Sequence, residues 1–415
     1  MKYDERNERS GLTLPSNPTT ATLLTAIQAV PGDDAPRLIF ADHLAESGEP
    51  ADLARAEFIR VQLTLARLSA DHSRTALLVA RQADLLQQFH AAWTEPVKGL
   101  VSGVEFRRGF LDAVSVDATQ FLEVGDELFR RVPIRKVRLL NASRCGDRLI
   151  ASPLLSHIRE LDLAGTELGN GGMNLLLRSP YLSQIEFLDV SFNGLDDRSA
   201  MHLAESMALP SLTALSLTDN RIGGEGVRRL AESPWFPRLQ SLDLTANAVT
   251  EIGIRAIVER ASRDLVVLRI GSNSIGDEGV AAFVESPLAG QLLRDESRLD
   301  LRKVGLESPG CASLVRSPFL HSVSRLDLSE NEIETVGVRT LAGGTFPRLR
   351  HLNLRNNRID DDGAIALARS PLMKSLAHLD LANNKLTKTS TDELLAARRT
   401  PQTVVDLSGN FIEEM

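Results

Sequence analysis

The residues with the clearest capacity for chemistry are aspartates that recur about every 27 positions, each flanked by apolar residues. Leu242-Asp243-Leu244 and Leu379-Asp380-Leu381 are examples. In chain order the central position holds Arg138, Asp162, Asp189, Ser216, Asp243, Arg269, Asp300, Asp327, Asn353, Asp380 and Asp406. Paired carboxylates can serve acid–base catalysis or hold a metal ion. Because alternate residues of a strand face opposite sides, these side chains should point away from the leucines and stack one strand apart.

Three adjacent pairs of this column are both acidic: Asp162/Asp189, Asp300/Asp327 and Asp380/Asp406. Two carboxylates about 4.8 Å apart in water repel by roughly 0.9 kcal/mol before screening. Solvent on an open strand face screens such groups, and no enclosed pocket is implied. The pattern therefore favours a solvated face, or a mixed-charge surface that binds a partner, over an acid–base or metal site.

Cations and aromatic residues accompany the acidic column. Phe187 and Phe192, beside Asp189, are predicted to be exposed and to offer an aromatic anchor. Basic residues are more frequent after Ser297, so the early repeats are more acidic and the later ones mixed. The predicted partner-binding residues are Asp162, Phe187, Asp189, Phe192, Asp243, Arg269, Arg298, Asp300, Arg302, Arg325, Asp327, His351, Arg355, His378 and Asp380.

Other candidate chemistry is weaker. Asp33, Asp34, Asp42, His43 and Glu46 form a dense polar group, and Asp42 and Glu46 are one helical turn apart, as in some metal sites. Alternating apolar residues favour a solvated helix face instead. The glycine-rich segments at 169–172 and 223–226 lack the Lys-Ser/Thr of a phosphate-binding loop, and HExxH and GxSxG motifs are absent from the sequence. The sequence predicts no catalytic residue, no metal and no cofactor.

The elements that position the acidic column belong to a repeat of the form Leu-x-x-Leu-x-Leu-x-x-Asn-x-Ile, clearest at 212–222. Its asparagine column holds Thr166, Asn193, Asn220, Asn247, Asn273, Val304, Asn331, Asn357, Asn384 and Asn410, spaced by 26 or 27 residues except for 31 before Val304. A degenerate copy at 134–139 brings the total to about eleven units. Each unit reads as a short strand followed by a helix, with Asp277 and Asp361 at predicted helix N-caps.

The asparagines are predicted to be structural. An amide inside the turn can bond backbone groups that would otherwise be buried and unpaired. The predicted ladder is Asn193, Asn220, Asn247, Asn273, Asn331, Asn357, Asn384 and Asn410.

Over roughly residues 134–415 this pattern resembles the leucine-rich repeat family, in particular its ribonuclease-inhibitor-like branch with longer, helix-containing repeats. The resemblance implies an α/β solenoid, a horseshoe with a parallel sheet on the concave face and helices on the convex face. Simple geometry agrees: strands stack about 4.8 Å apart whereas packed helices need roughly 8–10 Å, so the stack must curve toward its strands.

The N-terminal third is predicted to be helical up to Pro96, with helices near 19–30, 37–44, 52–68 and 74–93. Residues 21–68 resemble a bacterial repeat-companion domain, a family that implies no assigned activity. A hairpin turning at Arg108-Gly109 and a helix capped by Asp117 should shield the first repeat. The predicted domains are a disordered leader (1–18), a helical companion domain (19–96), a hairpin–helix cap (97–133) and the repeats (134–415).

Composition narrows the function classes. The net charge of −8 and sparse aromatic residues argue against nucleic-acid binding. The sequence has no apolar window of about 20 residues and no signal-like start, which favours a cytoplasmic location without membrane contact. Two cysteines, Cys145 and Cys311, are too few for a four-ligand zinc site.

The sequence therefore predicts a non-catalytic scaffold that binds a protein partner on its concave face. Two alternatives stay open: a regulator of an enzyme in trans, such as a nucleotide-hydrolase activator, and a weak metal-dependent hydrolase in the companion domain. The last strand, at 403–410, leaves an open sheet edge for self-association. The insertion at 290–297 is either a tolerated loop, a local bend or a partner-contacting loop.

Overall fold

A computed structural model describes residues 18–30, 32–68, 73–294, 297–398 and 403–411. The predicted leader at 1–18 thus lies almost wholly outside the described residues. The chain divides into two compact units, Met1–Asp162 (unit 1) and Leu163–Met415 (unit 2), which are treated separately. Within the described ranges, no helix combines the length and the apolar composition needed to cross a bilayer.

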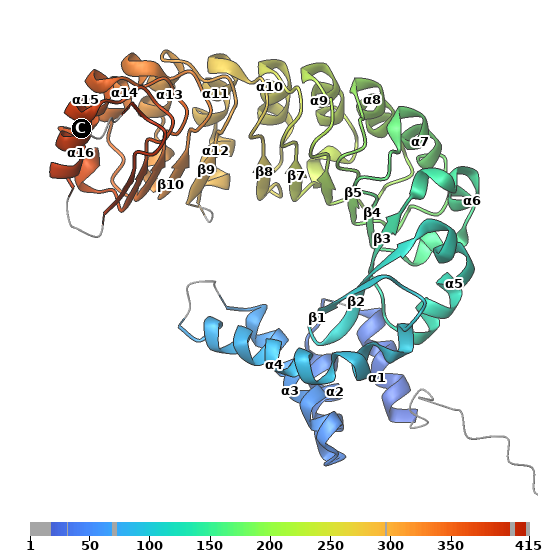
Figure 1. The fold of residues 1–415 in the computed structure, drawn as a ribbon. Helices are drawn as coiled ribbons and strands as arrows, with labels where there is room; N and C mark the ends of the chain where they lie inside the picture. The colour runs from blue at the N-terminus through green and yellow to red at the C-terminus, as the bar shows by residue number, and fades with distance from the viewer. Residues whose placement is uncertain (1–17, 31, 69–72, 295–296, 399–402, 412–415) are drawn as a thin grey trace, which may run out of the picture. The chain divides into compact units, whose positions relative to one another are not determined.

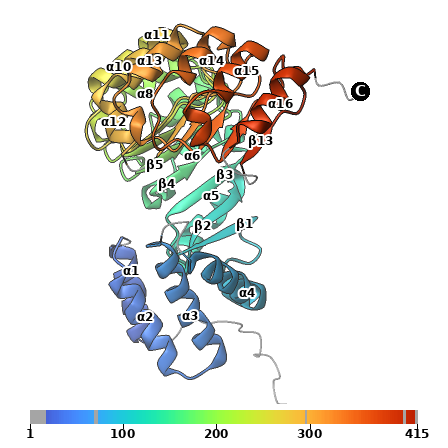
Figure 2. The ribbon, with the colours of Figure 1, turned by 90° about the vertical axis from the view of Figure 1, so that its left-hand side faces the viewer.

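Unit 1 begins with four helices, α1 (Pro18–Ala29), α2 (Ala35–Glu46), α3 (Pro50–Leu65) and α4 (Thr75–Thr94). Consecutive helices contact one another, as Figure 2 shows for α1, α2 and α3. Their apolar faces form two clusters, one around Phe40 and Ile59 and the other around Phe58 and Leu85. Phe110 joins the first cluster and Phe106 packs on the second, so the hairpin that carries them is part of the same core.

That hairpin joins β1 (Gly103–Arg107) to β2 (Phe110–Asp117) through a turn at Arg108-Gly109, the position that the sequence predicts. Asp117 then caps α5 (Ala118–Arg131) by accepting a hydrogen bond from the Thr119 amide at 2.9 Å. Strand β3 (Lys136–Leu140) pairs in parallel with β2 and with β4 (Glu160–Asp162), and α6 (Gly146–Ile150) lies between β3 and β4 in the chain. The hairpin therefore lies beside the first repeat strand.

Unit 2 alternates three-residue strands with short helices, which confirms the predicted repeat architecture. Figure 1 shows its helices along one side of the unit and its strands along the other. In chain order the elements are α7 (Gly169–Leu176), β5 (Phe187–Asp189), α8 (Asp197–Glu205), β6 (Ala214–Ser216), α9 (Gly224–Ala231), β7 (Ser241–Asp243), α10 (Glu251–Arg260), β8 (Val267–Arg269), α11 (Gly276–Val284), α12 (Pro287–Leu292), β9 (Arg298–Asp300), α13 (Gly310–Arg316), β10 (Arg325–Asp327), α14 (Glu334–Ala342), β11 (His351–Asn353), α15 (Asp361–Ala368), β12 (His378–Asp380), α16 (Lys388–Ala396) and β13 (Val404–Asp406).

The strand pairs described in unit 2 are parallel and keep the apolar residues in register, as in Leu326 opposite Leu352 and Leu352 opposite Leu379. Among the described residues, the sheet is interrupted between β8 and β9, and the order restarts as β9 to β13. The 31-residue repeat lies there, and residues 290–292 of its insertion belong to helix α12. The interruption therefore coincides with an extra helix between two strands.

In the repeats of unit 2, the chain turns through a residue in the left-handed conformation, always at the same position of the repeat. The position before the asparagine column has φ between 51° and 58° at Phe192, Asp219, Ala246, Ser272, Lys303, Glu330, Asn356 and Asn383, and 70° at Gly409. For a residue with a Cβ this conformation costs roughly 1–2 kcal/mol. The turn that contains it must therefore be held by strong local interactions.

The asparagine column supplies them. The Asn331 carbonyl accepts hydrogen bonds from the amides of Val304 (2.9 Å) and Leu306 (3.1 Å) of the preceding repeat. Its amide donates to the carbonyls of Leu301 (2.8 Å), Leu328 (2.9 Å) and Ser329 (3.2 Å). Asn193, Asn220, Asn273, Asn357 and Asn384 are likewise buried, whereas Asn247 and Asn410 are partly buried with the same kinds of partner.

Two predicted N-caps are wrong. Asp360 rather than Asp361 caps α15, by accepting from the Gly363 amide at 3.1 Å. Asp361 instead accepts from the Thr387 amide (2.8 Å), and Asp277 from the Glu307 amide (2.8 Å). Both carboxylates lie in the first turn of their helix, so they reach sideways to the next repeat.

We predict that Asn331→Ala lowers the free energy of unfolding by about 2–4 kcal/mol, because it leaves several buried backbone groups unpaired. Chemical denaturation followed by circular dichroism measures the change. The matched control is Asn174→Ala on the partly buried face of α7, expected to change stability by no more than about 0.5 kcal/mol. Equal effects of the two substitutions would show that the ladder does not hold the turns.

Candidate functional site

The candidate site is the strand face of unit 2, formed by the last residue of each three-residue strand, which is the central position between the leucines of the repeat, and by its neighbours. From β9 to β13 the central column aligns Asp300, Asp327, Asn353, Asp380 and Asp406 in register. The predicted pairs Asp300/Asp327 and Asp380/Asp406 are therefore adjacent. From β5 to β8 the column aligns Asp189, Ser216, Asp243 and Arg269. Asp162 ends β4 in unit 1, where it is buried and its carboxylate lies 3.7 Å from Lys136 Nζ.

One oxygen of each central carboxylate has a structural partner that sequence reasoning missed. Asp327 Oδ1 accepts from the amide of Ser329 at 3.0 Å, and Asp380 Oδ1 accepts from the amide of Ala382 at 2.9 Å. The same bond to the residue two positions on is made by Asp189, Asp243, Asp300, Asn353 and Asp406. This is an Asx turn, which Asp and Asn favour, and the recurrence of Asp or Asn at this position could have revealed it. The acidic column thus partly serves to stabilise the turn that follows each strand.

The neighbouring column has a different character in the two parts of the face. It aligns Phe187, Ala214, Ser241 and Val267 across β5–β8, and Arg298, Arg325, His351, His378 and Val404 across β9–β13. Among the described residues, the exposed Arg298 and Arg325 form no ion pair within 4.0 Å. Together with the carboxylates of β10, β12 and β13 they line a hollow of about 400 Å³. From β9 to β12 the face therefore presents two arginines and two histidines beside a mostly acidic column.

Two histidines stack in that row. The rings of His351 and His378 lie 4.5 Å apart at an interplanar angle of 11°. Burial lowers the pKa of His351, and the positive charges of His378 and Arg325 lower it further. Burial also raises the pKa of Asp380, as does the negative charge of Asp406. The face therefore changes its charge in the acidic range.

We predict that His351 titrates below the ordinary histidine value of 6.5, and that His378→Gln moves its pKa upward because a like charge is removed. The unfolded chain then binds more protons at this site than the folded chain, so the site's contribution to stability is present above pH 6.5 and is lost as the pH falls toward the folded pKa. NMR titration of the imidazole resonances measures both values. An unchanged His351 pKa in the variant would exclude the coupling.

The β5–β8 part of the face carries fewer charges. Arg269 pairs with Asp243 at 3.2 Å, and Phe187 is partly buried rather than fully exposed. Phe192 is 57% exposed and has φ 58°. An exposed aromatic residue in a left-handed turn contributes little packing while it adds backbone strain.

We predict that Phe192→Asn raises the free energy of unfolding by up to about 1 kcal/mol, because asparagine tolerates this backbone region. Phe192→Ala is the control, since alanine removes the ring but keeps the strain. Thermal unfolding of both variants measures the effect. A clear loss of stability in both would show that the ring packs on the protein.

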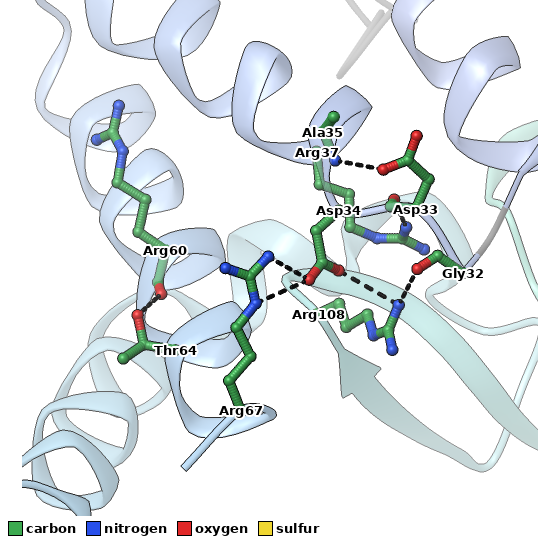
Figure 3. A network of polar contacts seen from close by, with 9 residues as sticks. All are labelled: Gly32, Asp33, Asp34, Ala35, Arg37, Arg60, Thr64, Arg67 and Arg108. Atoms are coloured by element: carbon green, nitrogen blue, oxygen red, sulfur yellow. Dashed lines mark hydrogen bonds and ion pairs between the residues drawn. The ribbon is translucent and has the colours of Figure 1, made fainter.

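The acidic group at residues 33–46 of unit 1 is engaged in salt bridges and turns. Asp34 binds Arg67 (2.8 Å) and Arg108 (3.2 Å), as Figure 3 shows, and Asp42 binds Arg60 (2.6 Å). Within the described part of the chain, no group of three His, Cys, Asp or Glu residues is arranged to hold a metal ion. Cys311 is buried, and that burial raises the pKa of its thiol to about 12, so it remains protonated.

Comparison with solved structures gives distant likenesses. An internalin (inlF) from Listeria monocytogenes matches at 18% identity and a TM-score of 0.34, covering 64% of this chain and 79% of the other. The complex of Rad7 and Elc1 in yeast matches at 12% identity and a TM-score of 0.39, covering 91% and 92%. At these TM-scores neither structure carries an argument about this chain, and no curated protein matches it.

The comparison with family models is more specific. The family described as Leucine Rich repeat matches at residues 155–177, 208–231, 261–284, 319–342 and 348–368. The ribonuclease-inhibitor-like branch and the N-terminal companion domain stay predictions. The matched segments, together with the parallel strand–helix units around them, make residues 155–368 of this chain an array of leucine-rich repeats.

Proposed function

We propose that the chain is a non-catalytic scaffold that binds a protein partner on the strand face of β9–β13. The observation that carries the proposal is the basic column of Arg298, Arg325, His351 and His378 beside the acidic one. The Asx turns account for the acidic column, but among the described residues Arg298, Arg325, His351 and His378 make no equivalent side-chain bond to a backbone turn. The presence of basic residues in four successive repeats is therefore better explained by binding to a partner than by a role in the fold.

The geometry of the face supports a protein as the partner. Its strands are joined by backbone hydrogen bonds and its turns by the asparagine ladder, so the surface is formed before binding and little ordering entropy is lost. Arginine is enriched at the energetically important positions of protein interfaces. A partner segment with carboxylates over Arg298 and Arg325 complements the exposed cations.

The same geometry favours binding over catalysis. The carboxylates that sequence analysis considered for acid–base chemistry each commit one oxygen to a backbone amide, as in Asp327 and Asp406. That hydrogen bond favours the charged form, and it lowers the pKa of Asp406. At Asp380 burial outweighs it and raises the pKa, which is the shift that a general acid needs, but the same bond still ties that carboxylate to the backbone turn. A cytoplasmic location and self-association through β13, at the end of its sheet, stay predictions.

We predict that the double substitution Arg298→Glu and Arg325→Glu weakens partner binding by about tenfold or more, because each interface arginine is worth about 1 kcal/mol. The partner is captured from the native host with the tagged full chain, and its affinity is then measured at low and moderate salt. Lys388→Glu is the control, since it reverses an exposed charge on helix α16.

Retention of full affinity by the double variant, with its fold intact by circular dichroism, would exclude this face. A captured enzyme whose turnover changes in the presence of the wild-type chain would identify the scaffold as a regulator in trans. An equal loss of affinity in the Lys388 variant would indicate a general charge effect rather than a defined site.

A further inference from the structure

The asparagine ladder has a gap where the 31-residue repeat follows its neighbour. The column residue there is Val304, whose side chain is fully buried and carries neither a donor nor an acceptor. In the next repeat, the Asn331 carbonyl accepts from the amides of Val304 and Leu306. Val304 cannot do the same for the corresponding amides of the preceding repeat, those of Asn273 and Ile275. We call this place the β8–β9 junction.

The strands are also less tightly joined at the β8–β9 junction. In the other repeats of unit 2, the residue after one strand donates its amide to the last residue of the next strand, as Leu244 does to Arg269 at 2.9 Å. Among the described residues, the corresponding bond from Ile270 to Asp300 is absent. The sheet order stops at β8 and restarts at β9. The gap in the ladder and the gap in the sheet therefore coincide.

The helix side of the same junction is intact. Helix α11 contacts both α10 and α13, and Figure 1 shows these three helices side by side. Helix α12 adds a further link, because Gln291 Nε2 donates to the Leu265 carbonyl just before β8 at 2.6 Å. On the other side of α12, a Cβ on Gly290 would lie 2.5 Å from Phe319 Cδ1 just before β10. Helix packing therefore continues across the junction.

Two backbone hydrogen bonds still cross the β8–β9 junction. The Ser272 amide donates to the Arg302 carbonyl at 2.7 Å, and the Gly276 amide donates to the Val304 carbonyl at 2.9 Å. Both bonds lie beyond the strands, where the chain turns toward α11 and α13. The junction is thus held at its helices and turns and is weak at its strands. Two arrays that are joined along one side only can rotate about the joined side.

We infer that the β8–β9 junction is a hinge, about which the strand face of β9–β13 changes its angle to the strand face of β5–β8. Each repeat of a solenoid contacts only its neighbours, so one weak junction leaves the arrays on both sides intact. The hinge separates the basic column that starts at Arg298 and Arg325 from the column of Phe187 and Ala214. Its motion therefore sets how far apart these two surfaces lie. The inference does not depend on the proposed partner.

The test is a distance measurement by double electron–electron resonance on the full chain with two spin labels. Val266→Cys and Val404→Cys place exposed labels near the strand side, one before and one after the β8–β9 junction. The native Cys145 and Cys311 are buried and do not compete for the label. The control pair is Arg298→Cys with Val404→Cys, which lies within one array. We expect the distance distribution across the junction to be about twice as wide as that of the control pair, as for a hinge between two rigid bodies.

Two ladder variants relate the motion to the missing asparagine. Val304→Asn supplies a side chain for the amides of Asn273 and Ile275, so it should narrow the distribution across the junction toward the control width. Asn357→Val removes an asparagine between β10 and β11, so it should broaden the distribution of the control pair. Circular dichroism checks that both variants fold.

A third label pair distinguishes a hinge from general mobility. Ile252→Cys on α10 and Val336→Cys on α14 are exposed positions on the helix side of the same junction, and their distribution should stay narrower than that of the strand-side pair. A change in the expected direction in either folded ladder variant would support the inference. It would be overturned by equal widths for the junction and control pairs, by equal widths on the helix and strand sides, or by unchanged widths in both variants.

Discussion

The constraint on which the repeats depend is the burial of backbone polar groups where each strand turns into its helix. Two amides and one carbonyl of one repeat and two carbonyls of the next converge on a single asparagine, as at Asn331. Neither the strand nor the helix can pair these groups, because the chain changes direction through a left-handed residue. The amide has both donors and acceptors, so one side chain type satisfies the turn in repeat after repeat. Each asparagine also links two neighbouring repeats.

The acidic residues of the strand face also serve to pair backbone groups. An Asx turn fixes the chain just after the strand, and it places Asp or Asn at most central positions from β5 to β13. The acidic charge of the face is in this sense a consequence of the fold. Among the described residues, the neighbouring column does not form Asx turns. It changes from Phe187, Ala214 and Ser241 to arginine and histidine after β8. The change coincides with the interruption of the sheet at the 31-residue repeat.

In unit 1, guanidinium groups are buried in an apolar core. The Arg55 guanidinium lies 4.8 Å from the ring centre of Trp93 and 5.2 Å from that of Phe106, where the negative ring faces replace water. Burial lowers the pKa of Arg55 to about 9, which still leaves it charged at neutral pH. Arg37 rests against Phe110 in the same way, and both guanidinium groups keep one buried donor without a hydrogen bond among the described residues.

Much of this protein could be predicted from the sequence because its main interactions are local or periodic. A period near 27 residues places the leucines inside and the asparagines in one column, and Arg108-Gly109 marks the hairpin turn before any coordinates are known. The recurrence of Asp or Asn that underlies the Asx turns was also present in the sequence. Tertiary structure alone decided which carboxylates reach across to the next repeat, as Asp277 and Asp361 do, and where the sheet is interrupted. It also brought Arg37, Arg107, Arg108 and Arg135 together around one hollow. Those residues follow no period, and their meeting depends on how a hairpin packs on helices, which no spacing in the sequence encodes.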